Sequence, residues 1–86
     1  MDINAAAEAI DRFLQTYQGR GGRKAVEVRS RPSGDDLDAV KVWVNLGAAA
    51  EKDDLEAWCT EAEAAIRAAL GAGGDAVKIE LRADAL

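Results

Sequence analysis

Few side chains in this sequence have the chemical types needed for catalysis near neutral pH. The 86 residues include no histidine, and the one cysteine, Cys59, falls within an apolar helical pattern, where we expect a packed and unreactive thiol. The serines Ser30 and Ser33 flank Pro32 without a base at a spacing that would activate them. We therefore predict a protein that is not an enzyme and uses no cofactor.

One acidic cluster has side chains of the type that binds metal ions. Asp35, Asp36 and Asp38 offer oxygen ligands, which suit a hard cation such as Ca²⁺. The cluster lacks the regularly spaced ligands and the distal bidentate glutamate of a calcium loop. A solvated loop between two strands is the simpler interpretation, so we predict no metal site.

Binding chemistry is indicated more clearly, by Trp43. This residue is out of phase with Val40, Val42 and Val44 in a strand-like run. Neighbouring side chains of a strand point to opposite faces, so Trp43 faces outward if the valines face a core. We expect Val26 and Val28, in the preceding strand-like run, to face the same core. Tryptophan with arginine nearby is a frequent centre of protein interfaces. The outward face of this sheet is therefore the candidate binding surface.

The first element that must support this face is an amphipathic helix at the start of the chain. Apolar residues recur at three- and four-residue spacing from Ile3 to Tyr17, with polar residues opposite them. Asp2 or Asn4 can cap the helix, and we expect Gly19 to end it in the left-handed conformation.

A second helix is predicted between the second and third strands. Its apolar stripe runs from Leu55 to Leu70 at helical spacing, and Asp53 followed by Glu56 resembles a capping box. Gly71 follows the last residue of the stripe and ends the helix. Whether residues 48–52 belong to this helix or form a short separate turn stays open.

Three runs alternate apolar and polar residues and are predicted as strands, at 25–31, 39–46 and 76–82. The first two form an antiparallel hairpin, whereas the intervening helix brings the third strand back parallel to the second. The prediction is one α+β domain over residues 1–86, with the order α-β-β-α-β. A three-stranded mixed sheet carries both helices on one face, and the strand order stays open.

The alternation makes the uncovered face basic. It displays five cations and two anions, together with Trp43 and Asn45, and the charged residues are Glu27, Arg29, Arg31, Lys41, Lys78, Glu80 and Arg82. The glycine-rich linker 18–24 adds Arg20, Arg23 and Lys24. These two regions hold a charge of +6, so the rest of a chain whose formal charge is −5 must sum to −11. We expect a basic sheet face and an acidic helical back.

We interpret the chain as a protein-interaction module, with self-association into a homodimer as one form of it. Trp43 would lie at the centre of the contact, and the cations Arg29, Arg31, Lys41, Lys78 and Arg82 would provide charge complementarity. The simpler alternative is that this face is solvated and has no partner, because strand surfaces often carry such charges.

Two other functions would depend on the same difference in charge between the sheet face and the helical back. The basic face could bind an anion or a single-stranded nucleic acid together with Arg20, Arg23 and Lys24, although the acidic overall charge and the shortage of aromatic residues count against it. The acidic helical back could instead cap a basic protein surface, as small inhibitors and chaperones do. No run resembles a signal peptide or a membrane span, so we expect a cytoplasmic protein that does not contact the membrane.

Overall fold

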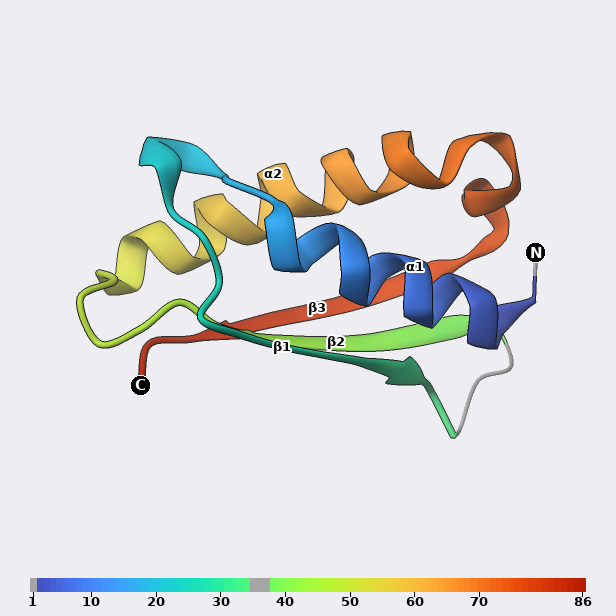
Figure 1. Ribbon diagram of the computed structural model, residues 1–86, viewed down its shortest axis with the longest axis horizontal. Coiled ribbons are helices and arrows are strands. Elements are labelled where there is room, and N and C mark those ends of the chain that lie inside the picture. The colour runs from blue at the N-terminus through green and yellow to red at the C-terminus, as the bar shows by residue number, and fades with distance from the viewer. Residues whose placement is uncertain (1, 35–37) are drawn as a thin grey trace.

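Two helices lie on one side of a three-stranded sheet, as the sequence predicts (Figure 1). The structure is a computed structural model that describes residues 2–34 and 38–86, with Arg20 described by its backbone alone. The elements in chain order are α1 (Ile3–Thr16), the 3₁₀ turn η1 (Arg20–Gly22), β1 (Glu27–Pro32), β2 (Ala39–Asn45), α2 (Lys52–Leu70), the 3₁₀ turn η2 (Gly71–Ala76) and β3 (Lys78–Asp84). The predicted α+β class and element order are confirmed.

The sheet has the strand order β1-β2-β3, which settles the point that the sequence leaves open. β1 pairs antiparallel with β2, and β3 pairs parallel with β2 on its other side. The hairpin and the parallel return through α2 are both as predicted. Trp43 therefore stands on the central strand, with a neighbouring strand on each side.

The core lies between the sheet and the two helices. Val40, Val42 and Val44 of β2 are at most 2% exposed. They pack in one cluster with fully buried residues of both helices, namely Ile10 and Leu14 of α1 and Trp58, Ala62 and Ile66 of α2. Burial of side chains of this size is the main source of stability in a domain this small. The same burial fixes which face of β2 is covered and leaves Trp43 on the other.

The two ends of α1 agree with the sequence prediction only in part. The Asp2 side chain accepts a hydrogen bond from the Asn4 N–H at 3.3 Å, which confirms Asp2 as the cap. The predicted left-handed stop at Gly19 is wrong, because the helix ends at Thr16 and Tyr17 leaves it in an extended conformation. This exit lets the Tyr17 ring pack against Trp58, with ring centroids 5.5 Å apart.

The start of α2 also differs from the sequence prediction. The helix begins at Lys52, after a turn at residues 48–50, and Glu51 at the N-cap position makes no capping hydrogen bond through its side chain. Asp53 lies inside the first turn, so the predicted capping box is wrong. Its carboxylate and that of Asp54 instead lie near the positive end of the helix dipole. Gly71, with φ of 72°, ends the helix as predicted.

The first strand starts two residues later than its alternation predicts. β1 begins at Glu27, and Val26 just before it is 70% exposed instead of facing the core. Ala25 takes the buried position at this point of the chain. Pro32, expected to end the strand, forms its last residue. An edge strand tolerates proline because the missing N–H faces away from the sheet.

Candidate functional site

Two cross-strand rows make up the centre of the open face. In the first row, Arg29 of β1 and Arg82 of β3 stand on either side of Trp43. In the second row, Lys41 of β2 stands between Arg31 and Glu80. Because β2 buries its alternate valines, the side chains of both rows point away from the helices. The alternation in the sequence predicts this arrangement correctly.

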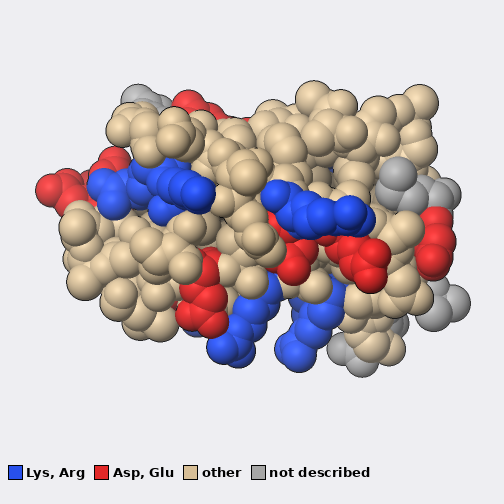
Figure 2. Space-filling view, viewed as in Figure 1, with Lys and Arg blue, Asp and Glu red and all other residues tan. Residues whose placement is uncertain are grey.

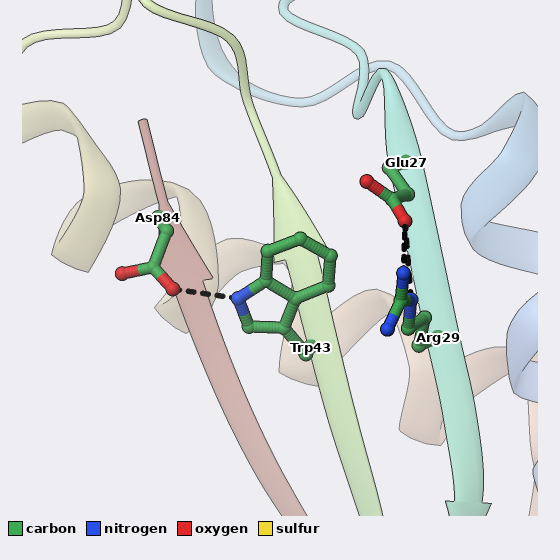
Figure 3. A network of polar contacts seen from close by, with 4 residues as sticks. All are labelled: Glu27, Arg29, Trp43 and Asp84. Atoms are coloured by element: carbon green, nitrogen blue, oxygen red, sulfur yellow. Dashed lines mark hydrogen bonds and ion pairs between the residues drawn. The ribbon is translucent and has the colours of Figure 1, made fainter. Parts of the chain in front are cut away.

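Trp43 is held in a defined position on this face (Figure 3). Its indole Nε1–H donates a hydrogen bond of 2.6 Å to Oδ2 of Asp84. On the other side, the guanidinium carbon of Arg29 lies 5.5 Å from the centroid of the ring, within the range of a cation–π contact. The side chain is half-buried by these neighbours. The indole is therefore a fixed platform and not a freely rotating group.

The four cations around Trp43 differ in how far they are already neutralised. Arg29 forms an ion pair of 2.9 Å with Glu27, and Arg82 lies 3.6 Å from Asp84. Arg31 and Lys41 have no ion pair with any described residue. They also stand directly opposite each other, which is unfavourable for like charges on a sheet. Of the four cations around Trp43, Arg31 and Lys41 are thus the two that no ion pair with a described residue neutralises.

These residues line a shallow hollow of about 650 Å³ on the open face. Its charged lining consists of four cations and one anion, namely Arg29, Arg31, Lys41, Arg82 and Glu80. In Figure 2, Lys and Arg side chains project from the lower border of the molecule, where Figure 1 shows the strands. The hollow combines an aromatic surface with local positive charge.

The sequence prediction misses one residue of this site, Asp84. The third strand continues to Asp84, two residues beyond its predicted end, so that this carboxylate joins Glu27 and Glu80 on the open face. The net charge of the face falls from the predicted +3 to +2. The signal is present in the sequence, because the alternation from Lys78 to Arg82 continues to Asp84.

Five of the six predicted partner-binding residues gather around the hollow, and Lys78 does not. Lys78 pairs with Ala39 at the opposite end of β3 from Asp84 and is absent from the lining. It lies on the open face but away from the indole. The predicted cluster around Trp43 is thus reduced to Arg29, Arg31, Lys41 and Arg82.

The predicted anion-binding linker lies apart from the open face. The Arg23 carbonyl accepts a hydrogen bond of 3.0 Å from Nε1 of Trp58, and its guanidinium lies 4.0 Å from Asp54 at the start of α2. Lys24 lines a different hollow, beside Gln15 of α1 and the start of β1. The side chain of Arg20 is outside the described part of the chain. The structure does not bring Arg23 or Lys24 together with the cations around Trp43.

The other candidate chemical groups do not form a site. Asp35 and Asp36 lie outside the described residues, and within the described ranges no three His, Cys, Asp or Glu side chains are placed to hold a metal ion. Cys59 is half-buried at the border of the core. Burial, and to a smaller extent the nearby Glu63 carboxylate, raise the pKa of its thiol, which makes it less reactive.

Comparison of the chain with models of protein families, with curated proteins and with solved structures finds no match. Neither helix in the described part of the chain has the length and apolar character required to cross a bilayer.

Proposed function

We propose that the protein is a non-enzymatic interaction module whose open sheet face binds an acidic segment of a protein partner. The observation that carries this proposal is the cross-strand pair of Arg31 and Lys41, which places two cations side by side in the row next to Trp43, and neither forms an ion pair with a described residue, although Glu80 stands on the other side of Lys41. A partner carboxylate between them would relieve their repulsion and accept charge-assisted hydrogen bonds from both.

Trp43 supplies the apolar part of the same contact. Tryptophans near the centre of an interface, with arginines around them, often contribute a large share of the binding free energy. Here the indole is already fixed by Asp84 and flanked by Arg29, so little side-chain freedom remains to be lost on binding. An extended peptide with a carboxylate and, two residues away, an apolar side chain would match the Lys41 row and the Trp43 row, because side chains two residues apart point to the same side.

A polypeptide suits this face better than a nucleic acid does. A nucleic-acid strand carries a continuous row of phosphates, and it would meet Glu27, Glu80 and Asp84 on the same face. Trp43 is the one aromatic residue that the described part of this face offers for stacking, whereas sequence-independent single-strand binders stack successive bases. Carboxylates spaced along a peptide can fall between these anions.

The two remaining interpretations have less support. Two open faces packed against each other would bring their Arg31 and Lys41 cations together, so a face-to-face homodimer is electrostatically disfavoured. On the helical back, the Glu63 carboxylate lies 3.4 Å from Arg67 of the same helix, which reduces the acidic charge available for a basic partner.

The proposal is tested by NMR titration of isotope-labelled protein with a short synthetic peptide that carries glutamate and leucine two residues apart, with serine at the positions between them. We expect a saturable shift of the Trp43 indole N–H resonance, and no such shift with a peptide that has lysine in place of glutamate. Arg31→Glu should weaken binding at least about tenfold. Arg12→Glu makes the same change of charge on an exposed position of α1 and should leave binding unchanged.

Two results would overturn the proposal. One is the absence of any saturable shift up to about 1 mM peptide, which is weaker than a specific contact of this size would give. The other is equal weakening by Arg31→Glu and Arg12→Glu, because it would show a general effect of net charge. Tighter binding of oligothymidylate, with an affinity that falls steeply with salt, would assign the face to nucleic acid instead.

A further inference from the structure

The outer edge of β3 offers a row of backbone groups for a further strand. The Lys78 N–H donates to the Asp38 carbonyl at 2.8 Å, and the Asp84 carbonyl accepts from the Leu46 N–H at 2.9 Å, so these residues point their backbone groups toward β2. Successive residues of a strand point these groups to opposite sides. The backbone groups of Ile79, Leu81 and Ala83 therefore point outward, and no hydrogen bond from a described residue reaches them.

The backbone carbonyl of Val77, just before this row, already accepts a hydrogen bond from within the chain. Nη1 of Arg67, on α2, donates a hydrogen bond of 3.1 Å to the carbonyl of Val77. Arg67 thus closes the edge at the start of β3. The open stretch that remains is the part of β3 centred on Leu81, and its side chains on the helical side, Ile79, Leu81 and Ala83, are only partly buried.

We propose that β3 pairs antiparallel with β3 of a second copy of the chain, on a two-fold axis at Leu81. The two three-stranded sheets then join into one continuous sheet. Leu81 stands opposite Leu81 of the second copy, and Ile79 stands opposite its Ala83. These are the residues whose backbone groups point outward, so each such pair exchanges both of its hydrogen bonds. Strand edges are ready templates for this kind of pairing.

Charge complementarity on the open face supports this particular pairing. With the axis at Leu81, Glu80 stands opposite Arg82 of the second copy, and Lys78 stands opposite Asp84. Symmetry repeats both contacts, so every charged residue of β3 meets an opposite charge. These are the non-hydrogen-bonded pairs of an antiparallel ladder, in which opposed side chains are closest.

The same charges disfavour the neighbouring registers. A slip by one step of the ladder in one direction sets Glu80 opposite Glu80 of the second copy, and Lys78 opposite Arg82. The slip in the other direction sets Arg82 opposite Arg82, and Glu80 opposite Asp84. Like charges directly opposite each other destabilise a sheet. The pattern of charge along β3 therefore selects the register with Leu81 on the axis.

The other edge of the sheet does not offer this complementarity. The Ser33 N–H donates to the Ala39 carbonyl at 2.9 Å, so the outward backbone groups of β1 belong to Val28, Ser30 and Pro32. Pro32 has no N–H to donate. An antiparallel self-pairing of β1 with at least two hydrogen-bonded pairs sets two of Val28, Ser30 and Pro32 opposite each other, and each such register also sets arginine opposite arginine, through Arg29, Arg31 or both. Self-association is thus expected at β3 alone.

The proposal is tested by sedimentation velocity over a range of protein concentrations. We expect the wild-type chain to form a dimer. Glu80→Arg should weaken the dimer at least about tenfold, because it creates two symmetric contacts between arginines, and Arg82→Glu should weaken it similarly. The double exchange, Glu80→Arg with Arg82→Glu, should restore the affinity to within about threefold, since opposite charges meet again. Glu8→Arg, on an exposed position of α1, is the control and should have no effect.

Disulfide cross-linking gives a second measurement that depends on the register. In a Cys59→Ala background, Leu81→Cys should form a disulfide-linked dimer on oxidation, because directly opposed Cα atoms lie at about 5.5 Å, within the range for a disulfide. Ile79→Cys should not cross-link, because it stands opposite Ala83 of the second copy. Equal cross-linking of the two variants would overturn this register.

The sedimentation outcomes decide the proposal independently of peptide binding at the open face. A chain that stays monomeric up to about 1 mM would overturn it, as would a dimer that Glu80→Arg does not weaken or that the double exchange does not restore. Growth beyond a dimer would indicate head-to-tail pairing of β3 with β1 and would also overturn it. Binding of the acidic peptide is read separately, from the resonance of Trp43 on the central strand β2 and from Arg31→Glu on β1, the strand at the other edge of the sheet.

Discussion

The two tryptophans of the chain use the same hydrogen-bond donor in opposite surroundings. Nε1 of Trp58 donates to the Arg23 carbonyl at 3.0 Å, and Nε1 of Trp43 donates to the Asp84 carboxylate at 2.6 Å. Trp58 is 1% exposed and lies in the core, whereas Trp43 is half-buried on the open face. The difference lies in what surrounds the ring, because apolar groups surround Trp58 and charged groups surround Trp43.

This comparison separates stability from recognition. A buried indole contributes by removing a large apolar area from water, and its N–H needs a partner only to avoid an unsatisfied donor. An indole on an open face contributes little by burial, and its hydrogen bond serves instead to fix the orientation of the ring. We therefore expect substitutions at Trp58 to act on folding and substitutions at Trp43 to act on binding.

The largest expected effect is that of Trp58→Ala. It removes the largest fully buried side chain and leaves a cavity between both helices and the sheet, which typically lowers the free energy of unfolding by about 3–5 kcal/mol. For a domain of this size that is a large part of the total stability. Urea unfolding followed by circular dichroism measures the change.

Trp58→Phe is the matched control for the hydrogen bond of the buried indole. It keeps an aromatic ring but removes one of the two donors to the Arg23 carbonyl, which still accepts a hydrogen bond of 2.9 Å from the Gly19 N–H, so we expect the lost hydrogen bond to cost about 1 kcal/mol, less than Trp58→Ala. If Trp58→Ala and Trp43→Ala reduced stability equally, the contrast between the two indoles would be wrong.

Gly19→Ala is expected to have the next largest effect, because it tests how closely the backbone approaches Trp58. A Cβ at Gly19 would lie 2.6 Å from Nε1 and 2.8 Å from Cδ1 of the indole, so the ring or the linker must move. Strain of this kind typically lowers stability by about 1–3 kcal/mol. Gly34→Ala is the control, because a Cβ there meets nothing within 4 Å, and urea unfolding of both variants should show a loss only for Gly19→Ala.

These residues also show how far the sequence determines the fold and the site. Periodicity predicts which side of each indole is covered, since Trp58 falls on an apolar helical stripe and Trp43 falls out of phase with buried valines. The contacts of the two N–H groups are not predictable, because they join residues 35 and 41 positions apart in the chain. Such partners depend on the exact ends of elements, which periodicity locates only to within a few residues.

Gly19 and Asp84 are examples of this limit. A glycine after a helix suggests a left-handed stop, but Gly19 is needed for its missing side chain, which only the neighbouring Trp58 reveals. Asp84 follows Ala83, a residue with weak strand preference, and the strand nevertheless continues because its pairing with β2 extends to Asn45. In both cases a tertiary contact decides what the local sequence leaves open.

Trp43→Ala should have a small effect on stability, of about 1 kcal/mol, because the ring is half-buried and its hydrogen bond joins groups near the solvent. Binding of the acidic peptide should instead be lost, and for this variant it is read from the backbone amide resonances of β1 and β2, because the indole resonance is gone. Asp84→Ala sharpens the test, because it keeps the indole but removes its acceptor. In a Trp58→Phe background, where Trp43 is the sole tryptophan, we expect Asp84→Ala to increase fast motion of the ring in time-resolved fluorescence anisotropy. An unchanged anisotropy decay would show that Asp84 does not position the indole.

The smallest expected effect concerns the border between the core and the solvent on α2, where half-buried Cys59 follows fully buried Trp58. Burial, followed by the charge of Glu63, raises the pKa of the Cys59 thiol, so the folded protein keeps this proton at a pH where the unfolded chain loses it. Stability from this group is therefore present below the ordinary thiol pKa and declines as the pH rises above it. Alkylation needs the thiolate, so at pH 8 the folded protein should react at least about threefold more slowly than the urea-unfolded chain.

Glu63→Gln separates the two causes of the raised Cys59 pKa. Removal of the carboxylate charge should move the pH profile of alkylation toward lower pH but leave it above that of the unfolded chain, because burial is the larger cause and remains. Glu61→Gln is the control, because burial and then the Glu61 charge raise the pKa of Tyr17, whereas Glu63 is the carboxylate whose charge acts on Cys59. If the folded and unfolded chains gave the same profile, Cys59 would belong to the solvent side of α2, and the core would end at Trp58.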